Sequence, residues 1–308
     1  MELVLQTNGL TKKYGKQITI NKVNLNIERG EIYGLIGKNG AGKTTIMKIV
    51  CGLIYQDQGD IKLFESSNLE KSRKRMGCII EQPSFYPGMT ARENLIYYDK
   101  LLGLTDYGNV DQVLSLVGLQ NAGKKKTKAF SLGMKQRLSI AISLLGNPDF
   151  LILDEPINGL DPSGIKEVRE LLLKLNSENE ITILISSHIL GELAKIATKY
   201  GIIDKGVLVD EFKAIELEQW CKKCLTIIVD NPERAAYILK NNINSSNFKI
   251  FDEGKICIYD RLDIPEQINK ELVENGVWVS RIWLEGNDIE TYFVKVLGAI
   301  NNDECSFQ

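Results

Sequence analysis

Hydrophobic and polar residues alternate along the first thirty positions, in LVLQTNGLTKKYG and again in ITINKVNLNIERGE. A period of two places every second side chain on the same face of a β-sheet. Glycines at positions 15 and 30 interrupt the alternation and mark turns. The segment is therefore predicted to form an antiparallel sheet.

From residue 32 onward, short and continuously apolar runs alternate with segments of helical spacing. The apolar runs are IYGLIG, DFLILDEP and ITILISSH, and their length and composition are typical of buried strands. Helical spacing is found in TTIMKIVCGLI, in 131–146, in 163–177 and in HILGELAKIATKYG, and IIDKGVLVDE predicts a hairpin. Strands alternating with helices predict an α/β fold with a parallel sheet covered by helices.

The pattern changes near residue 214. Beyond it, the order is strand, helix, strand, strand, helix and strand, followed by a last helix in IETYFVKVLG. This βαββαβ order is compatible with a ferredoxin-like unit. We therefore predict two domains, an α/β domain over 1–213 and a small accessory α+β domain over 214–308.

Charge and composition exclude several classes of function. The 308 residues include 38 Lys and Arg against 40 Asp and Glu, so no overall basic field favours nucleic acid. No stretch of about 18 apolar residues predicts a membrane span, and MELVLQTNGL lacks the features of a signal peptide. We therefore expect a cytoplasmic protein. The single histidine excludes a metal site built from several histidines.

The six cysteines are scattered, as expected for a reducing compartment. Cys221 and Cys224 form one C-x-x-C pair. A structural zinc site usually has a second pair of ligands, and the sequence pattern shows none. We therefore predict ordinary thiols rather than a metal or redox site.

The segment GKNGAGKT at 37–44 matches the G-x-x-x-x-G-K-[ST] pattern of a P-loop. It follows a predicted strand and opens a predicted helix, where glycines let backbone N–H groups turn toward phosphate oxygens. Lys43 can reach the β- and γ-phosphates of a nucleotide, and the Thr44 hydroxyl can ligate Mg²⁺. The predicted ATP-binding residues here are Gly37, Lys38, Asn39, Gly40, Ala41, Gly42, Lys43, Thr44 and Thr45.

A carboxylate pair ends the buried strand FLIL. Asp154 is predicted to hold Mg²⁺ through water, and Glu155 to polarise the attacking water as a general base. The alternative is that the acidic pair only closes a strand. Its position downstream of a P-loop favours the catalytic interpretation.

These motifs give the chain, over about residues 2–213, a resemblance to the ATPase subunit of ABC transporters. FSLGMKQRL at 130–138 resembles the family's signature sequence, with Leu132 and Met134 where glycine and glutamine usually stand. Ser131 and Gly133, which the resemblance places on the γ-phosphate, are kept. The P-loop, signature, acidic pair and histidine occur in the family's order. The implied fold is a P-loop ATPase cassette with a mixed sheet, an antiparallel β subdomain and a helical subdomain.

The resemblance assigns three further positions. Asp161, in NGLD, matches the segment that crosses the dimer interface, and Tyr14 matches the aromatic residue that stacks on adenine. His188 ends a buried strand where the family has a histidine that contacts the γ-phosphate and links Glu155 to the nucleotide. A histidine that merely ends a strand is the alternative interpretation.

The same resemblance implies cofactors, partners and location. The cofactors are ATP and Mg²⁺. Two subunits would close head to tail around ATP, each signature completing the other's P-loop site through the free N–H groups of a helix start. A separate integral membrane permease would hold the ATPase at the inner face of the membrane. The basic run at 124–128 has no interleaved aromatic residues, so we expect a solvated loop and no nucleic acid.

The loop that senses the metal and the membrane partner usually carries a glutamine. Aligning PSFYP places Glu81 at that position, and the rival alignment places Gln82 there. A glutamate here, the signature spelling and the length of the C-terminal extension resemble transporters of the bacitracin and lantibiotic kind. The sequence thus favours export of an antimicrobial peptide. The alternatives are the ATPase of a drug or other-substrate transporter, importers included, and an ABC ATPase without a transport role.

Overall fold

The computed structural model describes residues 2–81, 85–104 and 109–286, and the chain divides into two compact units. Unit 1 is Met1–Ala214 and unit 2 is Ile215–Gln308. Each unit has its own hydrophobic core. Among the described residues, no helix combines the length and the hydropathy that crossing a bilayer requires.

The first sheet of unit 1 is antiparallel, as the alternating pattern predicts. Strand β1 pairs with β2 and β3 and also with β5, a later strand. Gly15 lies in the turn between β1 and β2, and its positive φ of 61° suits glycine. The strands are β1 (Leu3–Tyr14), β2 (Gln17–Val23), β3 (Asn26–Glu28) and β5 (Gln58–Leu63).

The second sheet of unit 1 has the order β10-β9-β4-β8-β7-β6. All neighbouring strands are parallel except the hairpin of β9 and β10. Every residue of β4, β7 and β8 is buried, which explains their continuous apolarity. The strands are β4 (Ile32–Ile36), β6 (Met76–Ile79), β7 (Phe150–Leu153), β8 (Thr182–Ser187), β9 (Lys199–Asp204) and β10 (Val207–Lys213).

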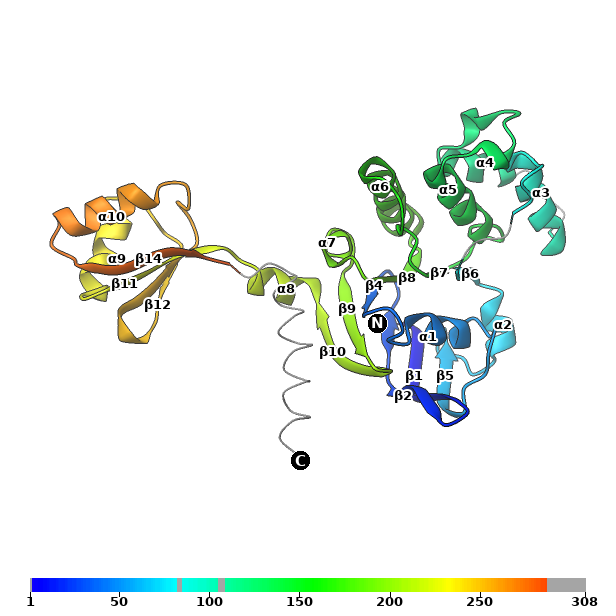
Figure 1. The fold of residues 1–308 in the computed structure, drawn as a ribbon, viewed down its shortest axis with the longest axis horizontal. Coiled ribbons are helices and arrows are strands. Elements are labelled where there is room, and N and C mark those ends of the chain that lie inside the picture. Colours follow the sequence, from blue (N-terminus) through cyan, green and yellow to red (C-terminus); the bar gives the residue numbers. More distant parts are fainter. Residues whose placement is uncertain (1, 82–84, 105–108, 287–308) are drawn as a thin grey trace. The chain divides into compact units, whose positions relative to one another are not determined.

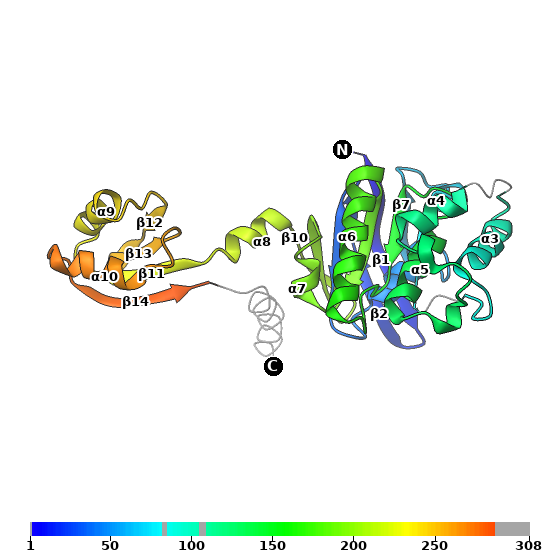
Figure 2. The same ribbon diagram turned by 90° about the horizontal axis from the view of Figure 1, so that it is seen from above.

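Helices lie on both sides of the second sheet, and α3, α4 and α5 gather in one helical group (Figures 1 and 2). The helix predicted over 163–177 is confirmed as α6, with Asp161 as its N-cap. The α-helices are α1 (Lys43–Val50), α2 (Leu69–Arg73), α3 (Ala91–Leu101), α4 (Asn109–Leu116), α5 (Leu132–Ser143), α6 (Pro162–Asn179) and α7 (Leu190–Leu193). Two 3₁₀ turns are η1 (Gln120–Ala122) and η2 (Thr127–Ala129).

One predicted helix is wrong in extent. HILGELAKIATKYG forms only the single turn α7, and β9 begins inside the same segment at Lys199. The Thr198 backbone N–H donates to the Ile32 carbonyl at 2.8 Å, and Gly201 is paired with Leu35 of β4. Sheet pairing with β4 overrides the local helical spacing.

Tyr33 links the buried face of β4 to the hairpin and gives a stability prediction. Its side chain is fully buried, and its hydroxyl donates to Glu211 Oε1 at 2.8 Å. Burial, and then the Glu211 carboxylate, raise the pKa of Tyr33 well above 10. Tyr33→Phe keeps the buried ring and removes one hydrogen bond to a charged group. The free energy of unfolding should therefore fall by about 1.5–3 kcal/mol.

The pH dependence of this effect follows from the sign of the shift. A phenol whose pKa is raised in the folded state stabilises the fold below its unfolded pKa of about 10, and that stability is lost above it. The wild-type protein should therefore lose thermal stability between about pH 9 and 11 more steeply than Tyr33→Phe. Circular dichroism melts across this range measure the difference, and parallel curves would contradict the assignment.

Unit 2 is a four-stranded antiparallel sheet of order β12-β13-β11-β14, with α9 and α10 packed together. This order and the βαββαβ sequence of elements form a ferredoxin-like unit, compatible with the sequence pattern. Its core is built from the faces of β11 and β13 that carry Leu225, Ile227 and Ile256. The helix predicted in IETYFVKVLG lies outside the described residues. The elements are α8 (Ala214–Trp220), β11 (Cys224–Val229), α9 (Pro232–Asn241), β12 (Phe248–Ile250), η3 (Asp252–Gly254), β13 (Lys255–Ile258), α10 (Pro265–Glu274) and β14 (Val279–Glu285).

Candidate functional site

The predicted P-loop connects β4 to α1, as the motif requires. Gly42 is the N-cap of α1 at φ 111°, a conformation that L side chains rarely adopt. A Cβ on Gly37 would lie 2.4 Å from the Ile203 carbonyl oxygen. Lys38, Asn39 and Gly40 are exposed at the tip of the loop, whereas Ala41 is buried and Thr45 is half-buried. The glycines therefore allow a tight loop that ends at the N-terminus of a helix, which suits phosphate.

Gly37→Ala is expected to weaken ATP binding by about tenfold, roughly the loss of one charge-assisted hydrogen bond. The added methyl group meets a backbone oxygen, so the loop itself must move. Gly88→Ala is the matched control, because Gly88 has open space around it and no positive φ. Fluorescent nucleotide titration compares the two, and equal affinities would contradict the proposed packing.

Lys43 is buried beneath the loop. Its ammonium donates to the Gly37 carbonyl at 2.7 Å and the Lys38 carbonyl at 3.3 Å, and lies 3.3 Å from Glu155 Oε1. A lysine held by loop carbonyls is positioned where phosphate oxygens could replace those carbonyls.

Thr44 and Asp154 form an oxygen pair next to Lys43. The Thr44 hydroxyl donates to Asp154 Oδ2 at 2.7 Å, and Asp154 is only 8% exposed at the end of β7. Hydroxyl and carboxylate oxygens are ligands that Mg²⁺ prefers. The donor set therefore fits the metal that the sequence predicts.

Ser186, on β8, is a site residue that sequence reasoning missed. Its hydroxyl donates to Asp154 Oδ1 at 2.6 Å and accepts from the Glu155 backbone N–H at 2.9 Å. Ser186 thereby orients the Asp154 carboxylate and fixes the backbone of Glu155. The sequence signal that could have indicated it is a hydroxyl residue near the end of the apolar run ITILISSH. In the structure this serine is fully buried.

Glu155 is the point where the side chains converge. Its Oε2 lies 2.9 Å from His188 Nδ1 and accepts from Asn158 Nδ2 at 3.3 Å. The Glu155 backbone has φ 47°, a left-handed conformation that is rare for a residue other than glycine and common at functional sites. Asn158, like Ser186, was not predicted as a site residue.

The structure therefore brings Lys43, Thr44, Asp154, Glu155 and His188 together. They follow β4, β7 and β8, three neighbouring parallel strands, at their carboxyl ends. Ligands of open α/β sheets bind at that edge.

The signature residues lie at the start of α5. Ser131 is its N-cap and accepts from the Met134 backbone N–H at 3.2 Å, which confirms the predicted helix start. Leu132 is 51% exposed. Asp161 caps α6 by accepting from the Gly164 backbone N–H at 3.3 Å. Within the described part of the chain, no hydrogen bond or ion pair joins Ser131, Gly133 or Asp161 to the Glu155 cluster.

Two further predicted residues lie outside the Glu155 cluster. Tyr14 is the last residue of β1 and is 52% exposed, and the next strand, β2, places Ile20 against Gly42. Glu81 forms an ion pair with Lys48 of α1 at 2.5 Å. Gln82, its rival for the sensing position, lies outside the described residues.

The fold and these contacts define a P-loop ATPase cassette. Residues 20–158 match the ABC transporter family. The chain is 42% identical over 302 residues to "Bacitracin transport ATP-binding protein BcrA" of Bacillus licheniformis, which covers 97% of this chain and 98% of the relative. It is 46% identical over 209 residues to "Lantibiotic transport ATP-binding protein SrtF" of Streptococcus pyogenes, covering 68% of this chain and 90% of that protein.

A solved structure agrees with the sequence relatives. "Dimeric structure of a post-hydrolysis state of the ATP-binding cassette MJ0796 bound to ADP and Pi" has a TM-score of 0.60 and 26% identity, covering 68% of this chain and 98% of that one. The chain belongs to the ATP-binding proteins of ABC transporters, and it is an ATPase of that family. The predicted family and cassette fold are confirmed.

Proposed function

We propose that this chain hydrolyses ATP to drive a separate membrane permease that exports or removes an antimicrobial peptide. The supporting observation is the extent of the similarity to the bacitracin transport protein of Bacillus licheniformis, which spans 97% of this chain and therefore reaches into unit 2. A transporter for another substrate remains the alternative. In either case the chain would lie in the cytoplasm, held at the inner face of the membrane by the permease.

The Thr44 hydroxyl and the Asp154 carboxylate are proposed to hold Mg²⁺, with Glu81 or Gln82 as a third contact. Mg²⁺ bound there would neutralise phosphate charge during hydrolysis. Asp154 is already oriented by the Ser186 hydroxyl at 2.6 Å. Thr44 is at hydrogen-bond distance from the same carboxylate.

Within this proposal, Lys43 exchanges its loop carbonyls for the β- and γ-phosphates of ATP. Glu155 accepts a proton from the attacking water, and His188 holds Glu155 through the 2.9 Å contact between Nδ1 and Oε2. Tyr14 stacks on adenine. Gly37, Lys38, Asn39, Gly40, Ala41, Gly42 and Thr45 complete the phosphate cradle.

A second copy of the chain is proposed to close head to tail on this site. Its Ser131 and Gly133 would direct the N-terminal N–H groups of α5 at the γ-phosphate, and its Asp161 would lie at the interface. The exposed start of α5, with Leu132 51% exposed, supports this role. ATP would favour the closed dimer and hydrolysis the open one.

The test expresses this chain in a sensitive bacterium, together with any integral membrane protein encoded beside it, and measures resistance. Wild-type protein should raise the inhibitory concentration of bacitracin or of a lantibiotic, and Glu155→Gln should not. The control is an unrelated drug of similar size. Two outcomes would contradict a peptide substrate. One is resistance to the unrelated drug alone, and the other is an active ATPase that confers no resistance to either compound.

A further inference from the structure

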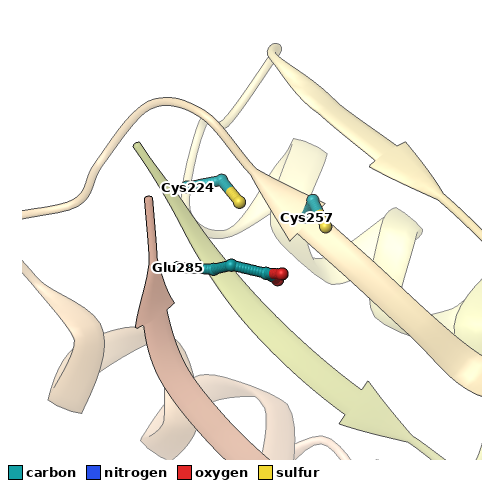
Figure 3. Close-up of side chains that lie close together, drawn as sticks. All are labelled: Cys224, Cys257 and Glu285. Carbon is teal, nitrogen blue, oxygen red and sulfur yellow. The ribbon is translucent and has the colours of Figure 1, made fainter. Parts of the chain in front are cut away.

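Unit 2 contains a cluster of metal-binding side chains that the ATPase chemistry does not use. Cys224 on β11, Cys257 on β13 and Glu285 on β14 have ligand atoms that all lie within 4.8 Å of one another. Figure 3 shows the Glu285 side chain reaching across β11 toward the two sulfur atoms. Three strands thus contribute one ligand atom each.

Strand register explains how residues so distant in sequence meet. Thr226 is paired with Cys257, and Cys224 is paired with Glu285. Cys224 and Thr226 are two residues apart, so they share a face of β11, opposite to Leu225 and Ile227 of the core. The four side chains therefore occupy the face of the sheet that does not carry the core.

The two thiols of the cluster are buried, whereas the carboxylate is partly exposed to solvent. Cys224 is 6% exposed and Cys257 4%, whereas the Glu285 side chain is 45% exposed. A buried pair of thiols gives a cation a site of low water content, and the partly exposed carboxylate leaves it a path of entry.

Thr226 and Lys255 hold the carboxylate in place. The fully buried Thr226 hydroxyl donates to Glu285 Oε2 at 2.6 Å, and Lys255 Nζ donates to the same oxygen at 3.0 Å. Thr226 Oγ1 also lies 3.5 Å from each sulfur. Contacts of this kind orient ligands in known metal sites.

We propose that Cys224, Cys257 and Glu285 bind one Zn²⁺ ion, which clips the edge strand β14 to β11 and β13. Two sulfur ligands and one carboxylate suit Zn²⁺, and a fourth position stays open to water. Two thiolates and a carboxylate carry three negative charges, which a divalent cation and the Lys255 ammonium balance. Tetrahedral Zn²⁺ needs sulfurs roughly 3.8 Å apart. The three ligand atoms already lie within 4.8 Å of one another, so small side-chain rotations complete the site.

The sequence pattern predicts ordinary thiols rather than a metal site, and the present proposal departs from that prediction. Cys221 and Cys224 form the C-x-x-C motif, but the cluster combines Cys224 with Cys257 and Glu285 instead. Antiparallel pairing, rather than motif spacing, therefore brings the ligands together. This proposal is independent of the transported substrate.

The test is titration of the full-length, reduced and metal-free chain with Co²⁺, a spectroscopic probe for tetrahedral zinc sites. One equivalent should produce the absorption band of thiolate-to-cobalt charge transfer, and one equivalent of Zn²⁺ should abolish it. Zn²⁺ should also raise the melting temperature of unit 2. A wild-type protein without the thiolate band would overturn the proposal, and Mg²⁺-type binding at the P-loop cannot produce that band because it uses oxygen ligands.

Variants assign the ligands. Cys224→Ser and Cys257→Ser should each remove the band, and Glu285→Gln should weaken Co²⁺ binding at least tenfold. Cys221→Ser is the matched control within the C-x-x-C motif. Cys78→Ser is a second control, because Cys78 and Cys51 form another pair of neighbouring thiols, in unit 1. Both control variants should keep the band. A band that survives Cys257→Ser but is lost in Cys221→Ser would overturn the assignment. Glu285 lies on an edge strand, so its variant tests the site even if a cysteine variant fails to fold.

Discussion

Glu155→Gln is expected to lower the ATP hydrolysis rate at least about 100-fold, as loss of a general base does. The amide keeps the shape of the side chain and its contact with Asn158, but it cannot accept a proton from water. Binding of ATP should change little, because Lys43 keeps its contacts with the loop. Phosphate release at saturating ATP and Mg²⁺ measures the rate.

The same variant should accumulate an ATP-bound dimer, since in the proposed cycle ATP closes the dimer and hydrolysis opens it. Size-exclusion chromatography with ATP resolves the dimer from the monomer. Glu170→Gln is the control, because Glu170 is exposed on α6 and forms an ion pair with Lys166 at 3.8 Å, away from the Glu155 cluster. A variant that hydrolyses ATP at the wild-type rate would show that Glu155 is not the base.

Much of the ATPase site follows from local sequence. The P-loop and the run FLILDE each contain their own structural context, a strand with a defined end, so the positions of Lys43 and Asp154 could be predicted. The N-caps Ser131 and Asp161 are equally local, since a cap depends on the first turn that follows it. Such features need no knowledge of distant parts of the chain.

The parts that could not be predicted depend on contacts across the sheet. Ser186 acts only because β8 lies beside β7, and α7 is short because β9 pairs with β4. The backbone N–H of Glu155 likewise donates to the Ser186 hydroxyl on the neighbouring strand. In unit 2, the pairing of β11 with β13 and β14 decides which cysteines meet.

Glu81 illustrates the limit of alignment. Its side chain contacts Lys48 on α1, the helix that begins with Lys43 and Thr44. The positive φ of 62° shows that the backbone turns sharply there. The ion pair with Lys48 is a contact between distant segments, which neither alignment of the loop shows.

His188→Ala is expected to reduce the ATPase rate about 100-fold while leaving the ATP dissociation constant within about twofold. His188 touches Glu155 Oε2 from the end of β8, whereas Lys43 and the P-loop carry the proposed contacts with the phosphates. The loss should therefore fall on the chemical step. Stopped-flow nucleotide binding and steady-state phosphate release separate the two quantities.

The double variant Glu155→Gln/His188→Ala gives the sharper version of this test. If His188 acts by holding Glu155, the two losses will not add, and the double variant will be about as slow as Glu155→Gln alone. Fully additive losses would mean that the histidine acts on the nucleotide independently of Glu155.

Because His188 is the only histidine in the chain, its imidazole NMR signals need no assignment. Those signals should shift on adding ATP and also in Glu155→Gln, and unchanged signals in both cases would contradict the contact.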